Sequence, residues 1–142
     1  MKLERLAFGN AVTAEPHQSV RQVARQMQKS GVGSVVVVTR KKPLGIVTDR
    51  DIATWIARGG KDADGTHVGQ IMSQWPLIAS TDSELEPVVD QMAKKGVHRI
   101  PIVNRKNDVV GVLSFDNVIE LVARYMRDLA EVVEKPKGKV RR

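Results

Sequence analysis

The feature that most constrains the fold of this chain is an internal duplication. The stretch GIVTDRD, at Gly45–Asp51, returns as GVLSFDN at Gly111–Asn117, 66 positions later. Upstream, matching pairs stand 65 positions apart: Val20 and Leu85, Val23 and Val88, Met27 and Met92, Gly31 and Gly96, and the run 35–38 with 100–103. One residue inserted in the turn before Gly111 accounts for the step from 65 to 66. Such agreement predicts that one structural unit occurs twice.

The predicted elements follow the same order in both copies: strand, helix, strand, strand, helix. The first copy is expected to hold strands at 11–14, 34–39 and 44–47, a helix from 20 that closes at 29–31, and a helix at 51–58. The second is expected to hold strands at 77–79, 100–104 and 109–113, and helices at 85–95 and from 116 to about 133. A unit of about 55 residues is marginal as an isolated fold. The expected fold class is therefore mixed α/β (α+β), with two pseudo-symmetric β-α-β-β-α repeats packed as a pair.

The predicted boundaries are a lead-in at 1–10, a first repeat at 8–64, a linker at 65–72, a second repeat with a long C-terminal helix at 73–133, and a basic tail at 134–142. The net charge is +7, and five of the positive side chains lie in that tail: Lys135, Lys137, Lys139, Arg141 and Arg142. We interpret the tail as disordered, solubilising sequence, which argues against nucleic acid as a partner.

Composition narrows the class of protein further. No cysteine occurs, which excludes disulfides and thiolate metal sites, and no histidine has a second ligand at i+3 or i+4. No apolar run approaches the roughly 18 residues of a membrane span, and the N-terminus lacks the apolar stretch of a secretory signal. We therefore expect a cytoplasmic protein with no metal site and no membrane partner.

Thr48 and Asp51 stand at the predicted start of a helix, and they allow two interpretations. The first is a capping box, in which the Thr48 hydroxyl and the Asp51 carboxylate satisfy backbone amides of the first turn. The second is a nucleotide site, because free amides and a hydroxyl can bind phosphate and a carboxylate can accept from both hydroxyls of a ribose. The two roles do not exclude each other.

The second copy carries His98 and Arg99 where the first copy carries Gly33 and Ser34. Arginine makes bidentate bonds to phosphate, and histidine adds another donor. A corner that is cationic in only one copy of a duplication favours a specialised binding role over a solvated charge.

The motif Gly-apolar-x-Thr-x-x-Asp, the helix-Gly-apolar-x-x-strand before it, Ile71-Met72-Ser73 and the double copy together resemble the cystathionine beta-synthase (CBS) domain. The resemblance spans roughly residues 8 to 127 and implies a tandem pair, or Bateman module. It also implies a regulatory sensor that binds AMP, ATP, NAD or S-adenosylmethionine between the copies and requires no cofactor, with Mg²⁺ only where a triphosphate carries it.

Carried over by position, the resemblance implies that Asp51 binds the ribose, that Thr48 lies near the phosphate, and that His98 and Arg99 bind it from the opposite copy. Apolar walls for the base would be Ile46, Ile78 and Pro101. The equivalent second site would comprise Thr13, Ser34, Val112, Ser114 and Asn117. It is expected to be weaker, because an amide replaces the carboxylate and neither Gly33 nor Ser34 supplies a cation.

Two other functions stay open: a dimerisation scaffold whose clefts are empty, and RNA binding through the basic tail. An enzyme is disfavoured, because no nucleophile has a base at a recognisable spacing. The apolar face of the last helix extends beyond what one small unit can cover, so we expect a homodimer and an unknown effector protein as partners.

Overall fold

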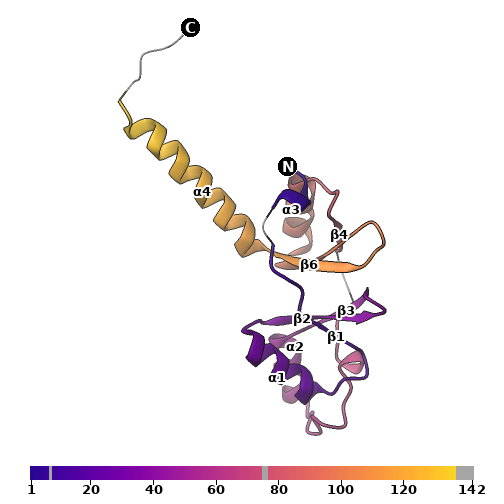
Figure 1. The fold of residues 1–142 in the computed structure, drawn as a ribbon. Helices are drawn as coiled ribbons and strands as arrows, with labels where there is room; N and C mark the ends of the chain where they lie inside the picture. Colours follow the sequence, from indigo (N-terminus) through magenta and orange to yellow (C-terminus); the bar gives the residue numbers. More distant parts are fainter. Residues whose placement is uncertain (7, 75–76, 137–142) are drawn as a thin grey trace.

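The computed structural model describes residues 1–6, 8–74 and 77–136 (Figure 1). The first copy contains β1 (Thr13–Ala14), α1 (Val20–Ser30), β2 (Ser34–Thr39), β3 (Lys42–Thr48) and α2 (Asp49–Ala57). The second contains β4 (Ala79–Ser80), α3 (Leu85–Lys95), β5 (Arg99–Val103), β6 (Val109–Ser114) and α4 (Phe115–Glu134). Two short 3₁₀ helices, η1 (Leu3–Arg5) and η2 (Val68–Gln70), precede them. The predicted order of elements and the mixed α+β class are confirmed. Most of the predicted tail lies outside the described residues.

Each copy forms its own three-stranded sheet, in the order β1-β2-β3 or β4-β5-β6. The first pair of strands is parallel and the second antiparallel in both sheets. Alternate residues of β2, such as Val35 and Val37, pack in one core with α1, while Ile100 and Ile102 of β5 pack in the other core. Figure 1 shows the two sheets in the middle, with α1 and α2 outside one sheet and α3 outside the other.

The ends of the helices and strands follow local sequence signals. Ser19 caps α1 in a full capping box with Gln22, and Gly31 and Gly96 end α1 and α3 in the left-handed conformation at φ 65° and 63°. The strand predicted at 44–47 begins earlier, at Lys42. The turn lies at Arg40 and Lys41, and β3 includes Pro43 because an edge strand tolerates a residue without an amide hydrogen. The two-residue strands β1 and β4 are shorter than predicted.

The segment that precedes each repeat packs in the core of the other repeat. Leu3, in the lead-in, is fully buried in the core of the second copy, and Val68 is fully buried in the core of the first. Lys2 forms a β-bridge with Glu84, and His67 forms the equivalent bridge with Ser19. The duplication therefore extends into both lead segments, and the segment predicted as a linker is part of the fold.

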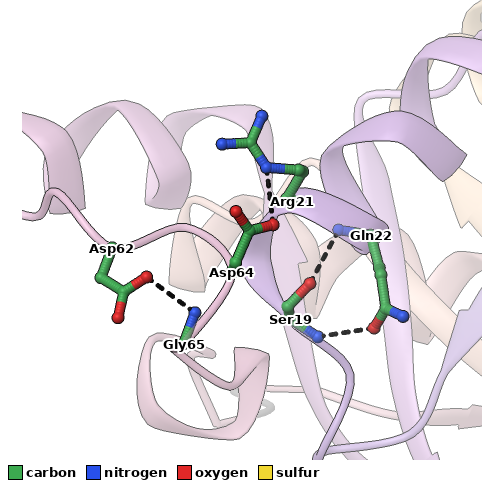
Figure 2. A network of polar contacts seen from close by, with 6 residues as sticks. All are labelled: Ser19, Arg21, Gln22, Asp62, Asp64 and Gly65. Atoms are coloured by element: carbon green, nitrogen blue, oxygen red, sulfur yellow. Dashed lines mark hydrogen bonds and ion pairs between the residues drawn. The ribbon is translucent and has the colours of Figure 1, made fainter.

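The loop before η2 is tied to the start of α1, as Figure 2 shows. Arg21 Nε lies 2.7 Å from Asp64 Oδ1, and the Gly65 amide donates to Asp62 Oδ1 at 2.9 Å. The Val20 amide also donates to the Thr66 carbonyl at 2.9 Å. The bonds from Arg21 and Val20 hold the lead segment of the second repeat against the first, and the Gly65 bond closes the loop on itself.

Candidate functional site

The start of α2 is a capping box built from the two residues that the sequence singles out. The Asp51 amide donates to Thr48 Oγ1 at 3.1 Å, and the Thr48 amide donates to Asp51 Oδ2 at 2.9 Å. Ser73 Oγ donates to Asp51 Oδ1 at 3.3 Å. A carboxylate has about four acceptor positions. Two of them remain for another donor, so the capping role leaves Asp51 able to bind a ligand.

A pocket of about 530 Å³ opens beside this capping box, and we call it the first pocket. Its lining comes from both repeats: Ile46, Thr48, Asp51, Ser73, Gln74, Gly96, Val97, His98 and Arg99. The volume lies within the range of about 300–1,000 Å³ that is typical of small-molecule sites. Five of the predicted site residues therefore line one pocket, with the carboxylate contributed by one repeat and the cation by the other.

The His98 and Arg99 wall stands where α3 has ended and β5 begins. The His98 carbonyl accepts from the Phe115 amide at 2.8 Å, and the two rings lie 5.3 Å apart between centroids at 49°. Among the ion pairs of the described residues, none involves Arg99 or Asp51. Both charges are therefore available at the rim of the first pocket.

A second pocket, of about 270 Å³, lies at the pseudo-symmetric position. Its lining is Gly9, Asn10, Val12, Gly31, Val32, Gly33, Ser34, Arg99, Val112, Ser114, Asp116 and Asn117. Every residue of the first pocket has a counterpart in this set, such as Val112 for Ile46 and Ser114 for Thr48. The Ser114 amide donates to Asn117 Oδ1 at 2.9 Å, so the amide side chain caps α4 as the carboxylate caps α2.

Two glycines explain why both pockets have a lead segment in their walls. Ser73 bridges Ile46 of β3, next to Gly45, and Gly9 bridges Val112 of β6, next to Gly111. A Cβ at Gly45 would stand 2.8 Å from the Ser73 carbonyl oxygen, and one at Gly111 would stand 2.9 Å from the Gly9 carbonyl oxygen. Glycine is therefore required for the close approach that completes each pocket.

Three of the predicted site residues do not line either pocket. Pro101 is fully buried two residues further along β5, so it cannot form an accessible wall. Thr13 and Ile78 occupy equivalent positions 65 residues apart; Thr13 is exposed on β1, and Ile78 is 40% exposed just before β4. Sequence reasoning also missed Gln74, Asn10 and the contribution of Arg99 to the second pocket. The motif Ile71-Met72-Ser73 was the one signal that pointed to the lead segment.

Neither a metal-binding cluster nor a membrane-spanning helix is found among the described residues. Within residues 1–6, 8–74 and 77–136, no three His, Cys, Asp or Glu side chains gather closely enough to hold a metal ion. In the same part of the chain, no helix combines the length and apolar character that crossing a bilayer requires.

Comparison with known proteins identifies the family. The CBS domain model matches residues 6–58 and 68–124, so the chain belongs to the CBS domain family and holds two repeats of that domain. The CBS domain-containing protein YhcV of Bacillus subtilis (strain 168) is 31% identical over 106 residues, which are 75% of this chain and 74% of the relative.

Solved structures with low sequence identity share the fold. The CBS domain protein PAE2072 of Pyrobaculum aerophilum, complexed with AMP, has a TM-score of 0.74 at 22% identity and covers 87% of this chain and 99% of its own. The CBS domain pair of protein MJ0100, in complex with 5′-methylthioadenosine and S-adenosyl-L-methionine, has a TM-score of 0.77 at 22% identity, covering 88% and 98%.

Proposed function

We propose that this chain is a regulatory module that binds an adenosine-containing small molecule in the first pocket. The observation that carries the proposal is the juxtaposition of Asp51 from one repeat with His98 and Arg99 from the other in one pocket of about 530 Å³. The spare acceptor positions of Asp51 suit the two ribose hydroxyls, and the Arg99 guanidinium suits a phosphate. The adenosyl ligands that the two structural neighbours carry agree with this chemistry.

The role of the module is regulatory rather than catalytic. Its first pocket offers a carboxylate, an imidazole and a guanidinium as binding groups, with Thr48 already engaged in capping α2. A ligand that contacts both repeats would favour one angle between them, because only differential contacts can shift a conformational equilibrium. The ligand signal would then reach α4, whose first turn packs against His98.

The decisive experiment is calorimetric titration of AMP, ATP, NAD and S-adenosylmethionine into the wild-type chain and into Asp51→Asn. The substituted amide keeps an acceptor for the Thr48 amide, as Asn117 does in the other repeat, so α2 stays capped. Losing a charge-assisted bond to the ribose should weaken binding by about 10-fold. At 100 times the Kd, a bound ligand should raise the free energy of unfolding by about 2.7 kcal/mol.

The matched control is Asp116→Asn, which changes the net charge equally but lies in the second pocket. It should leave the affinity for the first, most tightly bound equivalent of ligand within about twofold of the wild-type value. Equal affinity in wild type and Asp51→Asn would remove the ribose role of Asp51. Failure of all four ligands to bind the wild-type chain would favour the ligand-free scaffold instead.

We propose also that α4 forms a homodimer with a second copy of the chain. Apolar residues recur along α4 at alternate spacings of three and four: Phe115, Val118, Val122, Tyr125, Leu129 and Val132. This is the a/d pattern of a helix-helix seam. Leu129 is 65% exposed and Val132 71% exposed, and Figure 1 shows this part of α4 extending away from both sheets. Five acidic and two basic side chains give α4 a net charge of −3, which disfavours an anionic membrane as the occupant.

Light scattering after size exclusion tests the dimer. Leu129→Glu should convert it to a monomer, because the new carboxylate would be buried in the seam. Arg127→Glu introduces the same group on the opposite face of α4 and should remain dimeric. A monomeric wild-type chain would exclude the second copy, and sedimentation with anionic vesicles that is lost in Leu129→Glu would assign this face to a lipid surface.

A further inference from the structure

Arg99 lies where the two pockets meet. It begins β5, opposite Ser114 of β6, and its side chain lines both the first and the second pocket. Its guanidinium reaches Gly33 of the other repeat, where an added Cβ would stand 3.5 Å from Nη2. The same point would stand 3.2 Å from Asp49 Oδ2. The absence of a side chain at Gly33 leaves this position open to the guanidinium.

The ionisable side chains that line the two pockets are few. The first pocket has Asp51, His98 and Arg99, and the second has Arg99 and Asp116. Among the described residues that line either pocket, Arg99 is the one guanidinium or ammonium group. A phosphate in the second pocket would therefore face the Asp116 carboxylate with no other permanent cation than the one that serves the first pocket.

We propose that the two pockets share Arg99, so that an anionic nucleoside in one weakens the binding of an anionic nucleoside in the other. This inference rests on the proposed function, since it requires nucleosides in these pockets. The reason is electrostatic: one guanidinium cannot make its full set of bonds to two phosphates, and two phosphates beside it repel each other. The antagonism belongs to the phosphate, so neutral nucleosides should bind the pockets independently.

The test compares adenosine with AMP by calorimetry on the full chain carrying Asn117→Asp, which gives each pocket a carboxylate for ribose. Two equivalents of adenosine should bind with similar affinity, whereas the second equivalent of AMP should bind on the order of 10-fold more weakly than the first. Adding Ser34→Arg supplies the second pocket with its own guanidinium at the position equivalent to Arg99. Two equivalents of AMP should then bind within about threefold of each other.

A second variant gives a test that does not depend on where the side chain of the introduced arginine lies. Arg99→Gln in the same Asn117→Asp background should weaken both equivalents of AMP and reduce the difference between them, while adenosine binding is unchanged. Two AMP equivalents that bind as independently as adenosine with Arg99 intact would overturn the sharing. A single adenosine equivalent would also overturn it, yet would leave the proposed function standing. No binding of either ligand would reject the proposed function itself.

Discussion

The two pockets show which features a duplicated unit keeps and which it changes. Both are closed by a lead segment that approaches a glycine, and both have a capped helix N-terminus as one wall. The capping acceptor is Asp51 in one copy and Asn117 in the other, because a cap requires only an oxygen at that position. The opposite wall differs more between the copies: it holds Gly33 and Ser34 in the first copy and His98 and Arg99 in the second. The scaffold is therefore common to both copies, while the charge is specific to one.

The largest expected effect concerns that common scaffold. Gly45→Ala and Gly111→Ala should each lower the free energy of unfolding by about 1–3 kcal/mol, because the new Cβ overlaps a carbonyl oxygen of the lead segment. Urea denaturation measures the change, and Gly9→Ala is the control, since nothing lies within 4 Å of a Cβ there. A loss of stability in only one of the two glycine variants would break the equivalence of the copies.

The duplication allowed most of the fold to be predicted from the sequence. Because Thr48 and Ser114 both precede helices, and Gly31 and Gly96 both end them, local signals defined the elements twice over. The exchange of lead segments was not predicted. Leu3 and Val68 stand 65 residues apart, so the signal was present, but each lies outside the strands and helices that the sequence predicts. The core in which each of them packs belongs to the other copy, so the local periodicity of the sequence cannot reveal it.

The site was predictable in part for the same physical reason. Residues at strand and helix ends, such as Asp51 and Arg99, follow from local pattern plus the pseudo-two-fold pairing. The sequence could not exclude Pro101 from the pocket, because its burial depends on how far along β5 the pocket extends. The double role of Arg99 depends on the reach of its side chain past Gly33, which no spacing along the chain encodes.

The next effect tests whether charge, rather than shape, separates the two pockets. Asn117→Asp should strengthen adenosine binding in the second pocket by about fivefold to 10-fold, because a carboxylate accepts from ribose hydroxyls more strongly than an amide does. The stability of α4 should not fall, since Asp51 shows that aspartate caps an equivalent helix. Calorimetry would measure the second adenosine equivalent. Unchanged affinity would mean that the smaller volume of the second pocket, and not Asn117, limits binding there.

The smallest expected effect concerns a position at which the two copies carry side chains of opposite charge that contact each other. Lys42 and Asp108 are equivalent residues 66 positions apart, and Lys42 Nζ lies 2.6 Å from Asp108 Oδ1. The hydrogen bond from the Lys42 ammonium is the main reason that the pKa of Asp108 is lowered. A carboxylate with a depressed folded pKa adds stability above its unfolded pKa of about 3.9 and loses it as the pH falls through the folded pKa.

Lys42→Gln should therefore raise the pKa of Asp108 toward its ordinary value and flatten the decline of stability below about pH 4. Titration of the Asp108 carboxyl by NMR gives the first quantity, and urea denaturation across the acid range gives the second. Arg105→Gln is the matched control: it should raise the pKa of Asp82, whose main partner is Arg105, and leave that of Asp108 in place. If Asp108 titrates alike with and without the Lys42 ammonium, the two repeats do not hold each other through this pair of equivalent residues.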